Sequence, residues 1–231
     1  MSRSFFLDDA SALDDLQVFL SRAARIEEGS VRLIAGSGVL AVYVAVLSPA
    51  GLTDETPTVL GLRTVALRAG EDGTTESFDA VVPIRSLLTR VEAAQARSLA
   101  GPVPGPIRVS VPIEVNTVVW AAISPPRGGW HPLSAVSPAT LDAIARAGID
   151  EVAAAVPEGA GESIVRRVRS EVWGRPIPGI EHVPAGAAFA ALGLGFLGED
   201  DVRVFETGPW TRLTTRRGHV LVRRKPWTLS R

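Results

Sequence analysis

Residues 31–47, VRLIAGSGVLAVYVAVL, are the stretch of sequence that decides the fold class. Apolar, largely β-branched runs at 31–35 and 39–47 flank the turn sequence Gly-Ser-Gly, and this pattern predicts a β-hairpin. Because residues 39–47 are apolar on both faces, we expect them to form a central strand. Residues 33–53 hold no charge over a length that could span a bilayer, but their glycines and β-branched residues favour a strand over a membrane helix.

Helices and further strands are expected around this hairpin. Leucines at spacings of three and four, with Ser11 and Asp14 resembling a capping box, predict a helix at residues 9–26. The other elements of this first part are two strands and a helix, expected at residues 58–68, 77–82 and 84–99. The first part should therefore be a mostly antiparallel four-stranded sheet covered by flanking helices.

The second half of the chain mixes helices with strands. Alternating apolar and polar residues predict a strand at 107–115, which Pro112 should place at a sheet edge or break. Ser137 and the proline after it predict the start of a helix, and Gly148 predicts its left-handed stop. Further elements are a short helix at 150–156, a helix at 162–173, a buried helix at 185–197, and a three-stranded antiparallel meander at 202–206, 210–214 and 219–223.

These elements together predict an α+β fold with two lobes. The proline- and glycine-rich residues 101–106 predict a linker between an acidic lobe at residues 1–100 and a mildly basic lobe at residues 107–231. Residues 1–97 hold 9 arginines and 13 carboxylates, a net charge of −4, so the remainder carries +3 because the whole chain carries −1. The alternative is that both lobes pack as one domain.

The composition excludes several classes of chemistry. The chain has 231 residues, of which 46% are hydrophobic and 21% charged, so it can bury a core. With no cysteine, disulfides, thiolate catalysis and cysteine-based zinc sites are excluded. The single lysine, Lys225, lies near the end of the chain, which argues against a phosphate-binding loop, a Schiff-base lysine and a kinase-type lysine. Acidic residues near the start argue against an export signal, so we expect a soluble cytoplasmic protein.

No motif in the sequence identifies a cofactor, a metal or a catalytic residue. Residues 193–198 match the dinucleotide pattern G-x-G-x-x-G, but a predicted helix precedes them and an acidic turn follows, which is the reverse of what a bound pyrophosphate needs. The three histidines, His131, His182 and His219, lack metal-ligand spacing. The sequence therefore leans away from an enzyme without excluding one.

The basic end of the chain is the most suggestive feature. Residues 202–231 hold eight basic residues against one carboxylate, with aromatic residues between them. Arginines could neutralise phosphates while tryptophans stack on unpaired bases, or the arginines could pair with carboxylates of the acidic lobe or of a partner. The candidate contact residues for nucleic acid or a protein partner are Arg212, Arg216, Arg217, His219, Arg223, Arg224, Trp210 and Trp227.

A second candidate site is the irregular loop that contains Arg127, Trp130 and His131. Such a loop could line a pocket, because loops on rigid scaffolds often carry function. The alternative is a proline- and glycine-rich turn that a packed tryptophan anchors. The loop would have to open onto a pocket with convergent polar groups to be a small-molecule site.

Three functional hypotheses follow from these observations. The leading one is a non-catalytic protein that acts through protein–protein contacts, with a homo-oligomer expected. The first alternative is nucleic-acid binding by the basic C-terminal hairpin. The second alternative is a small-molecule enzyme or ligand-binding protein that uses the loop at residues 127–131. No membrane partner is expected.

Overall fold

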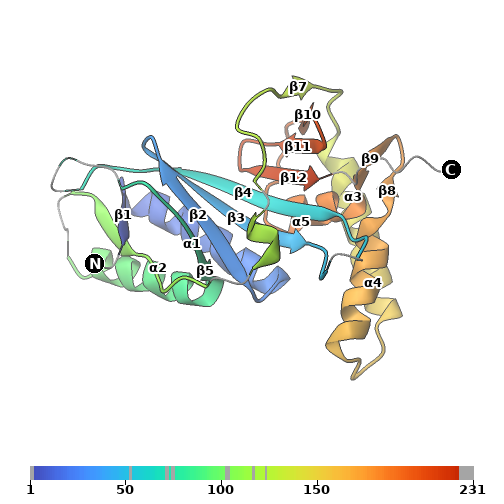
Figure 1. Ribbon diagram of the computed structural model, residues 1–231, viewed down its shortest axis with the longest axis horizontal. Coiled ribbons are helices and arrows are strands. Elements are labelled where there is room, and N and C mark those ends of the chain that lie inside the picture. The colour runs from blue at the N-terminus through green and yellow to red at the C-terminus, as the bar shows by residue number, and fades with distance from the viewer. Residues whose placement is uncertain are drawn as a thin grey trace. The chain divides into compact units, whose positions relative to one another are not determined.

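The computed structural model (Figure 1) describes most of the chain, namely residues 3–51, 54–70, 73, 76–101, 105–115, 118–122 and 124–223. The chain divides into two compact units. Unit 1 contains Met1–Val44 and Leu62–Ala122, and unit 2 contains Ala45–Gly61 and Ile123–Arg231. The predicted mixture of helices and a largely antiparallel sheet is confirmed.

Unit 1 begins with strand β1 (Ser4–Leu7) and helix α1 (Ala10–Ile26). Asp9 caps α1, since one of its carboxylate oxygens accepts a hydrogen bond from the Ala12 amide at 2.9 Å. The apolar face of α1 buries Leu13, Leu16 and Leu20 completely. Helix α2 (Ile84–Leu99) lies beside α1 (Figure 1), so both predicted helices of this unit are confirmed.

The predicted hairpin of β2 (Ser30–Gly36) and β3 (Val39–Leu47) is confirmed, and its register places Gly36 opposite Val39. Its turn places Ser37 and Gly38 in the left-handed region, at φ 52° and 74°, which glycine adopts without strain. Strand β3 lies between β2 and β4, so it is the expected central strand.

The prediction of a separate four-stranded sheet was wrong. Strands β4 (Thr58–Ala66) and β5 (Phe78–Pro83) are present, and so is the meander of β10 (Arg203–Thr207), β11 (Trp210–Thr214) and β12 (His219–Arg223). With the short strand β7 (His131–Pro132), all of these form one eight-stranded sheet in the order β5-β2-β3-β4-β12-β11-β10-β7. Hydrophobic alternation shows that a strand is buried, but it does not show which distant strand lies beside it.

The strand predicted at 107–115 is shorter than expected. Strand β6 (Ile107–Ser110) pairs antiparallel with β1, which the sequence analysis missed, and it ends before Pro112. Proline has no N–H for a neighbouring strand, so regular pairing stops at this position. The chain then runs beside β5, where the Val115 amide donates to the Val81 carbonyl at 2.8 Å.

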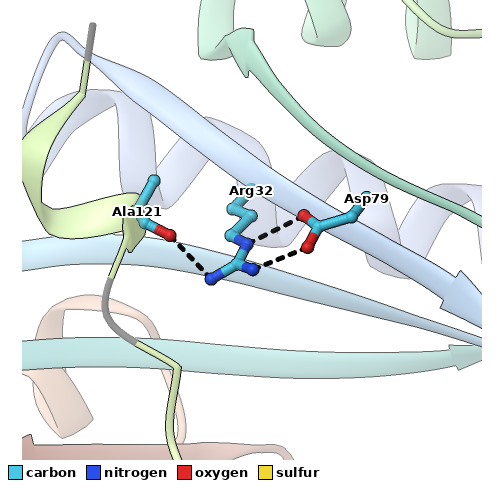
Figure 2. Close-up of polar contacts among 3 residues, drawn as sticks. All are labelled: Arg32, Asp79 and Ala121. Atoms are coloured by element: carbon cyan, nitrogen blue, oxygen red, sulfur yellow. Dashed lines mark hydrogen bonds and ion pairs between the residues drawn. The ribbon is translucent and has the colours of Figure 1, made fainter. Parts of the chain in front are cut away.

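A polar contact fixes the end of unit 1 (Figure 2). The guanidinium of Arg32 on β2 donates to both carboxylate oxygens of Asp79 on β5, at 2.8 and 2.6 Å. It also donates to the carbonyl of Ala121 at 2.6 Å. Ala121 belongs to the 3₁₀ helix η1 (Val119–Ala122), whose Trp120 is buried. These bonds hold η1 against the strands of unit 1.

Unit 2 corrects the predicted helix boundaries. Helix α3 (Pro138–Ala155) starts at Ser137 as expected, but it continues through Gly148 and includes the residues predicted as a second short helix. A Cβ atom at Gly148 would lie 2.2 Å from Cζ3 of Trp173 on helix α4 (Glu162–Gly174). Gly148 is therefore present because the indole ring needs the space, and not because the helix ends there.

Helix α5 (Ala185–Gly193) is the predicted buried helix, although it ends four residues earlier than expected. Its small side chains allow close packing against α3 and α4, and Phe189 stacks on Trp173 with ring centroids 4.4 Å apart. The hairpin of β8 (Pro176–Ile177) and β9 (Ile180–Pro184) leads into α5 and was not predicted. The glycine-rich residues after α5 follow a helix, as the sequence order indicated.

Two further expectations concern organisation and membranes. Residues 102–104 of the predicted linker lie outside the described residues, and a division of the chain at 101–106 stays a prediction. Within the part of the chain that the structure describes, no helix is long and apolar enough to cross a membrane.

Candidate functional site

The structure brings the two predicted sites of unit 2 together. The guanidinium carbon of Arg212, from the basic hairpin, lies 4.4 Å from the ring centroid of Trp130, from the predicted pocket loop. Phe205 is the cross-strand partner of Arg212, and its ring centroid is 4.8 Å from the same carbon. The guanidinium carbon of Arg203 also lies over the Phe205 ring, 5.9 Å from its centroid. We call Trp130, Arg203, Phe205 and Arg212 the arginine–aromatic cluster.

The arginines of this cluster lack acidic partners. Arg203 and Arg212 form no ion pair with any carboxylate in the described part of the chain. The Nε atom of Arg212 is buried and has no hydrogen-bond partner there. Burial, and then the positive charge of Arg203, lower the pKa of Arg212 from its usual value. The cluster is therefore a local excess of positive charge supported by aromatic rings.

The other predicted contact residues on the hairpin are engaged within the molecule. Arg216 forms an ion pair with Asp200 at 3.0 Å, and Arg217 donates to the Leu197 carbonyl at 3.2 Å. A ring nitrogen of His219 lies 3.1 Å from the Thr214 hydroxyl. Trp210 is only 4% exposed, so its ring faces are not open to a base. Arg223 is exposed and lines a pocket, whereas Arg224 and Trp227 lie outside the described residues.

The loop at residues 127–131 is fixed on the sheet. The indole N–H of Trp130 donates to the Pro126 carbonyl at 3.2 Å, and His131 on β7 pairs with Glu206 on β10. Arg127 and His131 are exposed. The cavities described below are lined by other residues, so the loop contributes to a surface and not to these cavities.

Sequence analysis did not select Arg203 and Phe205. The available signal was their spacing of two residues on a predicted strand, which puts both side chains on one face of the sheet. The strand register then places Phe205 opposite Arg212 and Pro132. The position of the neighbouring Trp130 depends on β7, which is only two residues long and gives no recognisable strand pattern.

Unit 2 also contains a pocket of about 610 Å³. Its walls come from the segment before β4, the end of α4, the β8–β9 hairpin and the end of β12. Apolar surface is provided by Pro57, Pro184 and Val222. This volume falls within the range of about 300–1,000 Å³ that is typical of ligand pockets.

Hydrogen bonds shape the wall that precedes β4. The carboxylate of Asp54 accepts from the Ala50 amide at 2.7 Å and from the amide and hydroxyl of Thr56 at 2.9 and 2.6 Å. The Thr56 hydroxyl also hydrogen-bonds the Ser170 hydroxyl on α4. Because Asp54 is used in this way, it positions the wall instead of facing a ligand.

The charged side chains that line the pocket are four carboxylates and two arginines. Glu55 and Glu171 are exposed at its edge. Glu181 accepts from the Gly179 amide at 3.0 Å, and backbone hydrogen bonds lower the pKa of this carboxyl group. The Nε2 atom of His182 is buried without a hydrogen-bond partner in the described residues. A buried polar atom of this kind is costly to leave unpaired, so it is a natural position for a ligand contact.

A second pocket, of about 520 Å³, surrounds the acidic turn that follows α5. The carboxylates at this turn include Asp200, which the ion pair with Arg216 already occupies. Across the described ranges, no group of three or more histidine and carboxylate side chains is arranged to hold a metal ion.

Comparison with protein-family models gives two matches, both to domains without an assigned function. Residues 1–109 match the Domain of unknown function DUF8010, and residues 125–227 match the Domain of unknown function DUF8185. No curated protein matches the chain.

Solved structures with a similar fold are sliding clamps. A DNA polymerase sliding clamp from Pseudomonas aeruginosa with ligand has a TM-score of 0.50 at 13% identity, over 98% of this chain and 66% of the clamp. A DNA polymerase III subunit beta from the same organism gives 0.48 at 12% identity, over 99% and 66%. A sliding clamp from Caulobacter crescentus gives 0.47 at 13% identity, over 96% and 65%. The fold thus resembles that of the sliding clamps, and the chain spans about two thirds of their length.

Proposed function

We propose that this protein is a non-catalytic scaffold that works by protein contact, and that the 610 Å³ pocket of unit 2 holds a basic, partly apolar segment of a partner protein. The observation that carries the proposal is the chemistry of this pocket. Its edge is acidic, its walls contain proline and valine, and the buried Nε2 atom of His182 has no partner in the described residues.

The charges at the edge favour a basic segment. Glu55, Glu171 and Glu181 all border the pocket. Two arginines also line it: Arg175, which pairs with Glu151 at 2.7 Å and with Glu171 at 3.9 Å, and Arg223. An acidic segment would meet repulsion from these carboxylates, whereas lysine or arginine side chains would be attracted. Apolar side chains of the segment would pack on Pro57, Pro184 and Val222, which supply the less polar part of the surface.

The fold supports a role in contact with other molecules. The similar solved structures are described as sliding clamps and as a subunit of DNA polymerase III, which are parts of a larger assembly. At 13% identity the likeness concerns the fold, so the choice of partner rests on the pocket residues of this chain.

The test is selection of binding peptides from a phage-displayed random library, followed by measurement of their affinities for purified variants. Glu171→Lys reverses a charge at the pocket edge, and His182→Leu removes the unpaired nitrogen. Glu158→Lys makes the same charge change at an exposed residue outside the pocket and serves as the control. Each pocket variant should weaken the selected peptides about tenfold, which corresponds to roughly 1.4 kcal/mol, while the control should bind like the wild type.

Basic residues should be enriched among the selected peptides. The proposal is wrong if no peptide is enriched above background, if acidic peptides are selected, or if both pocket variants bind the peptides as tightly as the wild type. Circular dichroism of each variant checks that its fold is intact.

A further inference from the structure

We propose that the arginine–aromatic cluster, together with Arg127, binds the phosphodiester backbone of a nucleic acid. The cluster lies on β10, β11 and the loop before β7, and none of its residues lines the 610 Å³ pocket. The inference therefore stands or fails separately from the function proposed above.

Arg212 lacks a hydrogen-bond partner for its buried Nε atom in the described residues. A partly buried guanidinium loses hydration, and proteins normally compensate it with a carboxylate or with carbonyl groups. The Nε atom of Arg212 has neither in the described part of the chain. The guanidinium carbon lies over the rings of Trp130 and Phe205, which are not hydrogen-bond acceptors of the carbonyl or carboxylate kind. The terminal amino groups of Arg212 also have no acceptor in the described residues, and an oxyanion from another molecule would supply one there.

Two further arginines of this surface also have no ion pair in the described residues. Arg127 and Arg203 are exposed, and within the described ranges neither forms an ion pair. Together with Arg212 they give three guanidinium groups on neighbouring elements of unit 2. On β10, Glu206 follows Phe205 and therefore projects toward the other face of the strand. Arg203 also borders the 520 Å³ pocket at the acidic turn, where Asp200 is already paired with Arg216. Three cations on one loop and two adjacent strands fit a ligand that carries several negative charges.

Aromatic rings hold the Arg212 side chain in place before any ligand binds. Guanidinium forms two parallel hydrogen bonds to phosphate oxygens, and an arginine that is already stacked loses less conformational entropy on binding. The contacts at 4.4 and 4.8 Å hold Arg212 in this way. By contrast, Arg216 and Arg217 are bonded to Asp200 and to the Leu197 carbonyl. The arginines of the basic hairpin thus form two groups: Arg216 and Arg217 bond to oxygen acceptors of the chain, whereas Arg212 contacts aromatic rings.

This separation provides the experiment. Fluorescence anisotropy measures binding of labelled oligonucleotides of about 30 nucleotides, as single-stranded DNA, single-stranded RNA and duplex DNA, between about 50 and 200 mM salt. The three arms identify which nucleic acid supplies the phosphodiester. The test variant is Arg127→Ala with Arg203→Ala and Arg212→Gln, and the matched control is Arg216→Ala with Arg217→Ala.

We expect the wild type to bind more weakly as salt increases. For single strands each phosphate contact contributes about 0.7 to the slope of log K against log salt, so the triple variant should reduce the slope by about 2. The control should leave the slope unchanged. If Arg212→Gln disturbs the fold, as near-ultraviolet circular dichroism would show, the exposed pair Arg127→Ala and Arg203→Ala should still reduce the slope by about 1.4.

The proposal is overturned if no oligonucleotide binds at the lowest salt concentration. It is also overturned if the Arg216 and Arg217 control loses as much of the slope as the test variant. A third check is competition for the bound, labelled oligonucleotide between polyglutamate and unlabelled DNA. If polyglutamate displaces the oligonucleotide more readily than unlabelled DNA does, the ligand is an acidic protein and the proposal is overturned.

Discussion

Arg32 fastens η1 to the strands of unit 1 through its bonds to Asp79 and Ala121 (Figure 2). The side chain of Arg32 is 14% exposed, and Asp79 raises its pKa by hydrogen bonding, partly offset by burial. Sequence analysis could not find this contact, because Arg32 and Ala121 are 89 positions apart and an arginine on a strand has no pattern that marks its partner. Contacts of this kind are a consequence of the fold and cannot be used to predict it.

Replacing Arg32 with alanine should lower the free energy of unfolding by about 1–2 kcal/mol, a value reduced because Asp79 is half exposed. Hydrogen exchange measured by mass spectrometry should increase at residues 119–122. Arg85→Ala removes an ion pair with Glu28 in which both side chains are exposed, so the loss there should be below about 0.5 kcal/mol. Equal losses in the two variants would contradict this role of Arg32.

Glu181 should make stability depend on pH. Its folded pKa lies below the ordinary value of 4.5 because backbone amides donate to the carboxylate. The stabilisation is therefore present above the unfolded pKa and is lost as the pH falls through the folded pKa. Glu181→Gln should be less stable than the wild type at neutral pH, and urea unfolding should show this difference shrinking below pH 4.5. A difference that stays constant or grows in acid would contradict the assignment.

At the scale of elements, helices and strands could largely be predicted, but their ends could not always be placed. Periodic apolar residues identified α1, α2 and the meander, because burial of one face imposes that pattern. Gly148 was misread as a helix stop, because glycine serves both at helix ends and at close contacts. The short strands β7 and β8 contain two residues each, too few for any alternation.

Gly148→Ala should destabilise the protein, although alanine is normally the better helix former by about 1 kcal/mol. The added methyl group would lie 2.2 Å from the Trp173 ring, so the packing of α3 against α4 must open. We expect a loss of about 1–3 kcal/mol in chemical denaturation. Gly51→Ala has no atom within 4 Å of the new Cβ and should change stability little. A stabilised Gly148→Ala variant would show that Trp173 does not occupy this space.

For the whole molecule, the α+β class was predictable from the apolar patterns of the sequence, but the single eight-stranded sheet was not, and the contact-based function stays a proposal. The strand order of the sheet joins β4 to β12, which are about 160 positions apart in sequence, and such pairings leave no local signal. The same reason explains the candidate site: Trp130 and Arg212 were selected separately, and the register of β7 and β10 brings them together.

Self-association is expected through unit 1. Ile113 and Val119 are 91% and 69% exposed. Ile113 is two residues from Val115, which bonds to the edge strand β5, and Val119 begins η1. Exposed apolar side chains next to a sheet edge favour contact with a second copy. Sedimentation velocity between about 1 and 50 µM should show a concentration-dependent dimer, about the range expected of a moderate interface. Ile113→Asp with Val119→Asp should be monomeric, whereas Leu99→Asp, at a residue of α2 that is 82% exposed, should dimerise. A wild type that stays monomeric throughout would contradict this expectation.

The most direct test of the proposed function is a nuclear magnetic resonance titration of the isotope-labelled protein with the tightest selected basic peptide. The account predicts amide shift changes concentrated at Thr56, Ser170, His182 and Val222, around the pocket. The imidazole of His182 should also change its signal, because its Nε2 atom gains a partner. Changes centred on the arginine–aromatic cluster, or an absence of changes at the pocket, would contradict the account.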